Sequence, residues 1–250
     1  MLTSKQLLVI MYQFRGANAK KNVKKTYNDY VEKHKKDKVS SNSAWCSETI
    51  AASFIKAGAL GLIGGLARQS DTFVKHFKAI GIWKAGHDRI PKVGDILIRG
   101  KNNDPYHSEV VLSVDEKKGT LKAVSGNYLG NVGIRTRSIH DKLTYGYGSP
   151  KYDAYKTVTP SIVQKVMMGL YGKGATIGTT RYNKLALEGY DPDAVQTKIN
   201  WVINTAQDIK DGKPDAVKKY GNDEQRKQAF GKWYDVVQKQ INVLYNIDIW

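Results

Sequence analysis

The 250-residue sequence contains one cysteine, Cys46, and five histidines. A single cysteine excludes an intramolecular disulfide and a zinc site built from cysteines of this chain, and the histidines form no HExxH pair. No stretch approaches the roughly 18 apolar residues that a membrane-spanning helix needs. The longest apolar run near the N-terminus, Leu7 to Met11, follows a lone lysine and lacks a small-residue cleavage site. We therefore expect no signal peptide, no stable membrane association, no bound metal and no cofactor.

Acidic residues are scarce relative to basic ones. The chain has 40 Lys and Arg against 23 Asp and Glu, a net charge of +17. Residues 1–150 hold 25 basic and 12 acidic side chains, and Lys20 to Lys38 is the densest basic stretch. Such an excess indicates a polyanionic partner. No RNP, KH, zinc-finger or basic-zipper signature accompanies the charge, and the anionic polymers of a cell wall would attract it as well as nucleic acid would.

The texture of the sequence changes near Thr157 to Pro160. Before this point, helical patterns are followed by a run of short strands, and after it helical patterns separated by glycine predominate. Helices followed by a run of strands are typical of an α+β domain. We expect an α+β domain at residues 1–157 and an all-α domain at residues 158–250.

The surroundings of Cys46 favour a catalytic role. Trp45 to Gly58 has apolar residues at helical spacing, so Cys46 falls in the first turn of a helix. Ser108 to Asp115 and Thr120 to Gly126 flank a charged turn and predict an antiparallel hairpin. If the turn centres on Lys117, paired residue numbers add up to 234, which places His107 opposite Asn127.

These three residues supply the groups of a cysteine hydrolase. The positive end of a helix favours the thiolate of Cys46, and a neighbouring imidazole strengthens this effect. His107 then protonates the leaving amine, while Asn127 orients the imidazole ring. Backbone N–H groups at the start of the helix are natural donors to the developing oxyanion.

The motifs AWCSETIAASFIKAGAL, PKVGDILI, YHSEVV and VSGN resemble those of the CHAP amidohydrolase/peptidases over roughly residues 35–140. The resemblance implies a papain-like or NlpC-like fold, with N-terminal helices packed on an antiparallel sheet. It also implies that Cys46 is the nucleophile, His107 the base and acid, and Asn127 the orienting residue. Many members carry glutamate where this chain has Ser125, although Glu109 lies opposite Ser125 by the same pairing. We expect Trp45, Glu109 and Ser125 to line the substrate site.

The second half contains a degenerate repeat, in which Gln196 and Gln238 occupy equivalent positions. We expect two three-helix bundles, at about residues 160–204 and 205–247. Their glycine turn, arginine and GYD-x-x-AVQ pattern resembles the wall-binding repeats of choline-independent phage lysozymes. The resemblance implies a saccharide or muramyl-peptide site in each copy, with aromatic faces and arginine forks as contacts. The expected residues are Arg181, Tyr190 and Asp191 in the first copy, and Arg226, Tyr234 and Asp235 in the second.

Together the two halves resemble a phage endolysin that cleaves peptidoglycan as an endopeptidase or an N-acetylmuramoyl-L-alanine amidase. The expected partners are peptidoglycan and anionic wall polymers. Such an enzyme is made in the host cytoplasm without a signal peptide and is released to act on the wall. Two alternatives remain open from the sequence: a cytosolic cysteine peptidase with another substrate, and a noncatalytic basic module that binds nucleic acid.

Overall fold

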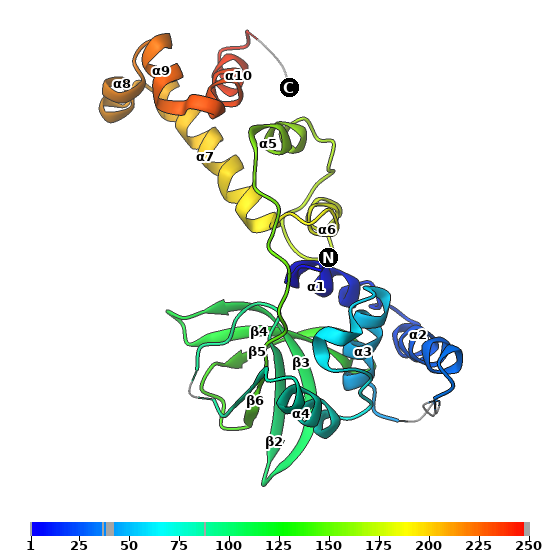
Figure 1. Ribbon diagram of the computed structural model, residues 1–250. Coiled ribbons are helices and arrows are strands. Elements are labelled where there is room, and N and C mark those ends of the chain that lie inside the picture. The colour runs from blue at the N-terminus through cyan, green and yellow to red at the C-terminus, as the bar shows by residue number, and fades with distance from the viewer. Residues whose placement is uncertain (1, 37, 39–42, 88, 248–250) are drawn as a thin grey trace. The chain divides into compact units, whose positions relative to one another are not determined.

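The computed structural model describes residues 2–36, 38, 43–87 and 89–247 (Figure 1). The chain divides into two compact units, Met1–Ala154 and Tyr155–Trp250, near the change of texture in the sequence. It combines helices with one open antiparallel sheet, which confirms the predicted α+β class. Among the described residues, no helix is both long and apolar enough to cross a membrane.

Unit 1 begins with helices and continues as a sheet, the order that the sequence predicts. Its helices are α1 (Ser4–Tyr12), α2 (Ala19–Lys33), α3 (Cys46–Lys56) and α4 (Ser70–Ala79), with a 3-10 turn at Leu60–Ile63. Its strands are β1 (Trp83–Ala85), β2 (Ile96–Lys101), β3 (Asp104–Asp115), β4 (Thr120–Tyr128), β5 (Asn131–Ser138) and β6 (Thr144–Gly148). Neighbouring strands follow the order β1-β6-β2-β3-β4-β5, and each pair is antiparallel. The short strands β1 and β6 were not predicted.

The β3–β4 hairpin has the predicted register only over part of its length. Val110 pairs with Val124 and Val111 with Ala123, as expected from a turn centred on Lys117. The expected pair of His107 with Asn127 is wrong, because the β3–β4 ladder ends at Val110 and Val124, and His107 pairs only on its other side, with Arg99 of β2. β4 is irregular between Ser125 and Tyr128, and Asn127 has a φ of 59°, in the left-handed region. The backbone of β4 therefore leaves the regular ladder before it reaches His107.

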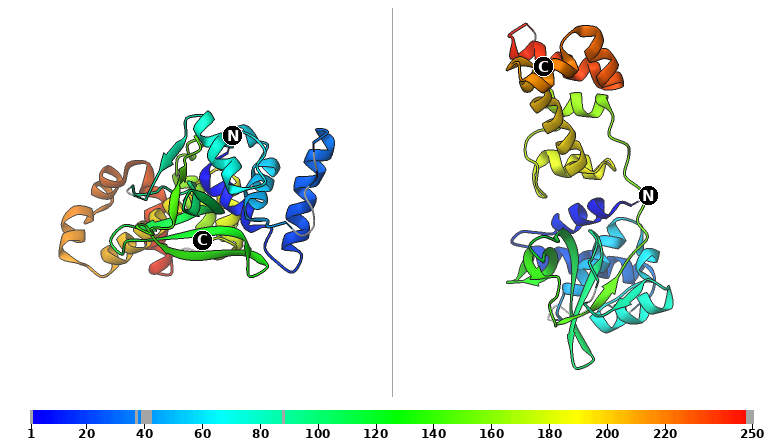
Figure 2. Two further views of the ribbon diagram at one scale, coloured as in Figure 1. Left: turned by 90° about the horizontal axis from the view of Figure 1, so that it is seen from below. Right: turned by 90° about the vertical axis from the view of Figure 1, so that its left-hand side faces the viewer.

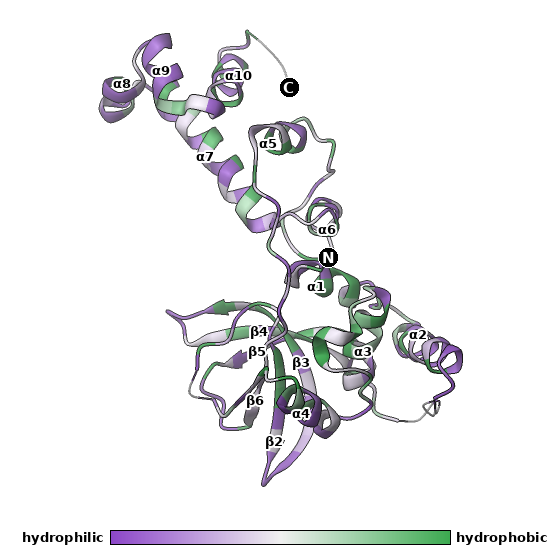
Figure 3. Cartoon of the chain, in the orientation of Figure 1, coloured by the Kyte–Doolittle hydropathy of each residue, from purple (hydrophilic) through white to green (hydrophobic). Residues whose placement is uncertain are grey.

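α3 forms the layer next to the sheet and packs on β3 and β4, while α2 packs on the outside of α3 (Figures 1 and 2). Gly126 of β4 allows this close approach: a Cβ there would lie 1.9 Å from Thr49 Oγ1 and 2.9 Å from a ring carbon of Trp45. Hydrophilic residues predominate along α2 (Figure 3). Residues 20–33 of the basic stretch noted in the sequence therefore belong to an outer helix, whose buried side is made by residues such as Val23, Tyr27 and Val31.

The PKVGDILI motif forms the turn that leads into β2. Gly94 has a φ of 90°, and a Cβ there would lie 2.5 Å from the Cβ of Ser4. Asp95 accepts hydrogen bonds from the Lys92 backbone N–H, at 2.8 Å, and from Arg89. Gly94 and Asp95 thus fix the turn that leads into β2, and they are not among the groups around Cys46 described below.

Unit 2 is helical, with α5 (Pro160–Met167), α6 (Thr180–Leu187), α7 (Pro192–Lys210), α8 (Pro214–Tyr220), α9 (Asp223–Phe230), a 3-10 turn (Gly231–Trp233) and α10 (Tyr234–Leu244). Thr159 and Asp191 cap α5 and α7, and both helices have proline at their start, as predicted. One cluster of buried residues draws on both copies of the repeat, including Val195, Val202, Val237 and Ile241. The two copies therefore share a core, whereas we expected a separate bundle for each.

Candidate active site

Cys46 is the first residue of α3, and its side chain is almost completely buried, at 5% exposure. Among the described residues, no side chain caps the N-terminus of this helix. Burial opposes ionisation of the thiol. The hydrogen bond and charge of His107 outweigh it, together with backbone N–H donors at Ser108 and Ser47, and the pKa of Cys46 falls below its ordinary value. The structure thus favours the thiolate.

His107, on β3, lies between Cys46 and a carboxylate. Its Nε2 is 3.1 Å from Glu109 Oε1, and the ring also hydrogen-bonds Cys46. Burial disfavours the imidazolium, but the hydrogen bonds to Cys46 and Glu109 and the charges of both groups raise the pKa of His107 to about 9. His107 is therefore held as the imidazolium at neutral pH, and its charge and hydrogen bond shift the neighbouring thiol toward the thiolate that a cysteine nucleophile needs.

Glu109 is fully buried and has a second partner, Arg137 of β5. The Arg137 guanidinium donates to both carboxylate oxygens, with Nη2 at 2.8 Å and Nε at 3.0 Å. Burial alone would raise the pKa of Glu109, but the hydrogen bonds to His107 and Arg137 and their charges lower it to about 2. Arg137, Glu109, His107 and Cys46 thus form a row of alternating charge. A bidentate pair of this kind fixes both the charge and the orientation of the carboxylate.

The structure does not bring Asn127 into this row. Asn127 is exposed, and among the described residues no hydrogen bond joins it to His107. Glu109 takes the orienting position that we assigned to Asn127, because residues two apart on a strand point to the same face. Ser125 is buried, and its Oγ has no hydrogen-bond partner among the described residues.

The expected substrate contacts in the catalytic half are also corrected. Trp45, Glu109 and Ser125 are each at most 1% exposed, so none of them offers a surface to a substrate. Trp45 instead packs beside Gly126, which holds the start of α3 close to β4. All three residues therefore belong to the interior of unit 1.

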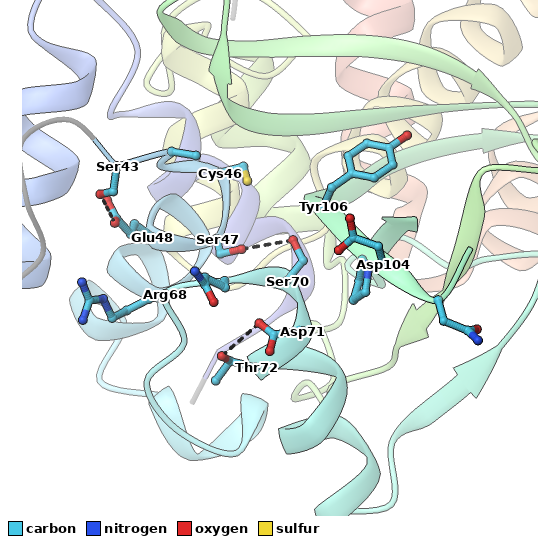
Figure 4. Close-up of a pocket in the computed structure, with 14 residues that line it drawn as sticks. Ser43, Cys46, Ser47, Glu48, Arg68, Ser70, Asp71, Thr72, Asp104 and Tyr106 are labelled. Carbon is cyan, nitrogen blue, oxygen red and sulfur yellow. Dashed lines mark hydrogen bonds between the residues drawn. The ribbon is translucent and has the colours of Figure 1, made fainter. Parts of the chain in front are cut away.

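A cleft of about 800 Å³ opens at Cys46. One wall is formed by the start of α3 and the segment leading into α4, and the opposite wall by the β2–β3 turn with Asp104 and Tyr106 (Figure 4). Glu48 in the first wall is buried and accepts from Lys24, at 2.9 Å, and from Ser43, at 2.8 Å.

In unit 2 the expected ligand residues of the first copy take part in local structure. Asp191 caps α7 by accepting from the Asp193 and Ala194 N–H groups. Arg181 donates to the Gly174 carbonyl and to Gln196 Oε1, at 3.0 and 2.7 Å. The Tyr190 ring is half-buried and has the Lys156 ammonium over one face.

The second copy differs at each matching position. Tyr234 starts α10 and donates a hydrogen bond to Asp223, and Asp235 lies exposed within the first turn, where it makes no cap. Arg226 donates to the Tyr220 carbonyl, at 3.2 Å, while its buried Nε has no partner among the described residues. The arginine–glutamine hydrogen bond of the first copy is therefore missing from the described contacts of the second. The matching residues of the two copies therefore make different contacts.

Sequence reasoning missed Arg137. It lies in the motif VGIRTRS, in which arginines alternate with small or polar residues, a pattern that also fits a solvated strand face. The one available signal was the presence of Glu109 on the same strand as His107, since a buried carboxylate needs a cationic partner.

Comparison of the chain with protein-family models, curated proteins and solved structures finds no match. The assignment of function therefore depends on the residues and their geometry.

Proposed function

We propose that this protein is a peptidoglycan hydrolase that cleaves amide bonds with Cys46 as nucleophile, as an endopeptidase or an N-acetylmuramoyl-L-alanine amidase. The observation that carries the proposal is the row Cys46–His107–Glu109–Arg137, of which Cys46 lines an open cleft. Perturbed pKa values of adjacent groups in a cleft are typical of catalytic sites. In this proposal unit 1 is a papain-like or NlpC-like domain of the CHAP type, and unit 2 carries wall-binding repeats.

The reaction follows from the positions of these groups. The Cys46 thiolate attacks the carbonyl carbon of the scissile amide, and an S–C bond forms as the carbonyl oxygen becomes an oxyanion. The uncapped N–H groups at the start of α3 are the donors for that oxyanion. When the C–N bond breaks, His107 gives its proton to the departing amine, which leaves a thioester.

Hydrolysis of the thioester restores the enzyme. Neutral His107 takes a proton from water, and the resulting hydroxide attacks the thioester carbon. The C–S bond then breaks, the carboxylic acid product leaves, and Cys46 is again a thiolate beside imidazolium. Glu109 stabilises the imidazolium both before His107 gives its proton to the amine and after it takes a proton from water. Because the pKa of Glu109 is about 2, its carboxylate stays ionised throughout the reaction. Arg137 keeps that carboxylate in place.

Wall hydrolysis is favoured over a cytosolic peptidase by the net charge of +17 and by the repeat in unit 2. Wall polymers are polyanions, so a strongly basic enzyme concentrates on them at low ionic strength. A nucleic-acid module would have no use for a thiolate–imidazolium pair in a cleft.

The test is hydrolysis of purified Gram-positive cell walls by the wild-type protein and by Cys46→Ser. We expect loss of turbidity and release of new amino and carboxyl groups with the wild type, and none with the variant. Mass spectrometry of the soluble fragments identifies the bond. Equal lysis by both proteins would refute the role of Cys46, whereas no lysis by either would refute the choice of substrate.

A further inference from the structure

Three serines form a buried cluster beside the cleft, which we call the serine cluster: Ser47, Ser70 and Ser108. They come from three different elements, α3, α4 and β3, and none is more than 3% exposed. The Ser108 Oγ lies 2.8 Å from the Ser70 Oγ and 3.0 Å from the Ser47 Oγ. The Ser47 and Ser70 hydroxyls, which Figure 4 draws, are 3.4 Å apart. Ser108 is therefore the centre of the cluster.

The choice of partners in this cluster is unusual for serines in or beside helices. A buried helical serine commonly bonds a carbonyl of its own helix, as Ser53 does with the Thr49 carbonyl, at 2.7 Å. Ser47 and Ser70 instead bond to each other and to a strand. Because a buried hydroxyl without a partner is costly, each of these hydroxyls is satisfied only while α3, α4 and β3 keep their positions. The serine cluster thus links α3, α4 and β3 by hydrogen bonds that small apolar side chains at these three positions could not make.

The cluster is attached to the reactive groups through the backbone. Ser47 directly follows Cys46, and Ser108 lies between His107 and Glu109. The backbone N–H groups of Ser47 and Ser108 both donate to the Cys46 sulfur. A shift of α3 along β3 would therefore move the sulfur away from the imidazole and from the Ser108 N–H at the same time.

We propose that Ser108, through its side-chain bonds to Ser47 and Ser70, is a positioning residue that holds the Cys46 thiol against His107. It acts from behind the site and touches no substrate. The inference depends on the proposed function only for the role of Cys46 as nucleophile, and it holds for any acyl substrate. The expected consequence of losing the hydroxyl is a smaller thiolate fraction at neutral pH, since both the imidazole and the N–H donor lose their alignment with sulfur.

The test uses the full chain and the rate at which iodoacetamide alkylates the thiol between pH 4 and 10. Because Cys46 is the only cysteine, every alkylation event reports on it. In Ser108→Ala we expect the midpoint of the pH profile to rise by about 0.5 to 1 unit, so that at pH values below the wild-type midpoint the rate falls about 3- to 10-fold, the factor that corresponds to one buried hydrogen bond.

Ser53→Ala is the matched control, because Ser53 is also fully buried on α3 but bonds only its own helix. It removes one buried hydrogen bond and no link between elements, so we expect the wild-type midpoint. A wild-type midpoint in Ser108→Ala would overturn the proposal. An equal shift in Ser53→Ala would overturn it too, since general loosening of α3 would then explain both results.

Ser70→Ala keeps the proposal testable if Ser108→Ala does not fold, as judged by circular dichroism and melting temperature. It leaves the bond between Ser47 and Ser108, so we expect a smaller shift in the same direction, and no shift would overturn the proposal. Alkylation needs no wall substrate, so the two ideas fail separately. A wild-type protein with a reactive thiol and no lytic activity would contradict only the proposed function, and a lytic Ser108→Ala variant with unchanged alkylation would contradict only this inference.

Discussion

Glu109→Gln distinguishes the orienting residue in the structure from the one expected from sequence. Glutamine has nearly the same size as glutamate but carries no charge, so the substitution removes the anion between two cations. His107 loses a charged acceptor at 3.1 Å, and Arg137 loses its bidentate partner at 2.8 and 3.0 Å. The nucleophile, the imidazole and the cleft keep their covalent structure. A loss of rate therefore measures what the carboxylate contributes.

The magnitude follows from the kind of bond that is lost. A hydrogen bond to a charged, buried group is worth about 1.5 to 3 kcal/mol. If that stabilisation is lost from the transition state, kcat falls about 10- to 150-fold at 1.36 kcal/mol for each factor of ten. The pKa of His107 also moves down from about 9 toward its ordinary value of 6.5, because the Glu109 charge and hydrogen bond are among the causes that raise it. The alkaline limb of the activity profile should therefore shift to lower pH.

The assay is the initial rate of amine release from soluble wall fragments at saturating substrate, measured from pH 5 to 10. Asn127→Ala is the control, and because Asn127 is exposed we expect a change of no more than about twofold. Melting curves of both variants show whether the fold is kept. If Glu109→Gln keeps wild-type kcat and pH profile while Asn127→Ala loses most activity, the orienting role belongs to Asn127 and our reading of the row is wrong.

Three further outcomes are expected. The wild-type kcat/KM should rise with pH as Cys46 ionises below its ordinary pKa of 9.0 and fall again as His107 loses its proton near pH 9, and a profile that keeps rising above pH 10 would contradict the ion pair. Gly126→Ala should lower stability by about 1 to 3 kcal/mol in urea unfolding, because its Cβ would overlap Thr49 and Trp45, whereas Gly61→Ala, with no atom within 4 Å of the added Cβ, should have little effect. Residues 1–154 alone should co-sediment with cell walls at low salt and release from them at about 0.15 M salt, where the Debye length falls to about 8 Å, while the full chain stays bound. Parallel release of both proteins would argue against a wall anchor in unit 2.

The local parts of the fold were predictable because they depend on neighbouring residues. The helix that begins at Cys46 follows from apolar spacing, and the β3–β4 hairpin follows from alternation around a charged turn. The same signals place Cys46 at the start of its helix, whereas His107, expected just before its strand, lies within β3, which begins at Asp104. β1 and β6 were missed because each is short, and they form only by pairing with each other and, for β6, with β2.

The third residue of the site was not predictable by the same route. The pairing rule extends a regular ladder to Asn127, but the ladder ends at Val124. Gly126 brings β4 against Thr49 and Trp45 of a different element, and the strand bulges next to this contact. A tertiary contact thus decides the register at the site, and no pattern within β3 or β4 contains it.

The location of Glu109 makes the orientation of His107 independent of that bulge. His107 and Glu109 are two residues apart on the same strand, so the rise of about 3.3 Å per residue sets their spacing. A slip of β4 therefore cannot separate them. What the carboxylate needs from elsewhere is a cation, and Arg137 supplies it from β5, where its backbone pairs with Leu121 of β4. The guanidinium hydrogen-bonds Glu109 of β3, which is two strands away from β5 in the sheet. The reactive pair is therefore coupled to β5 through charge, and a substitution at Arg137, remote from the cleft lining, should change the chemistry of Cys46.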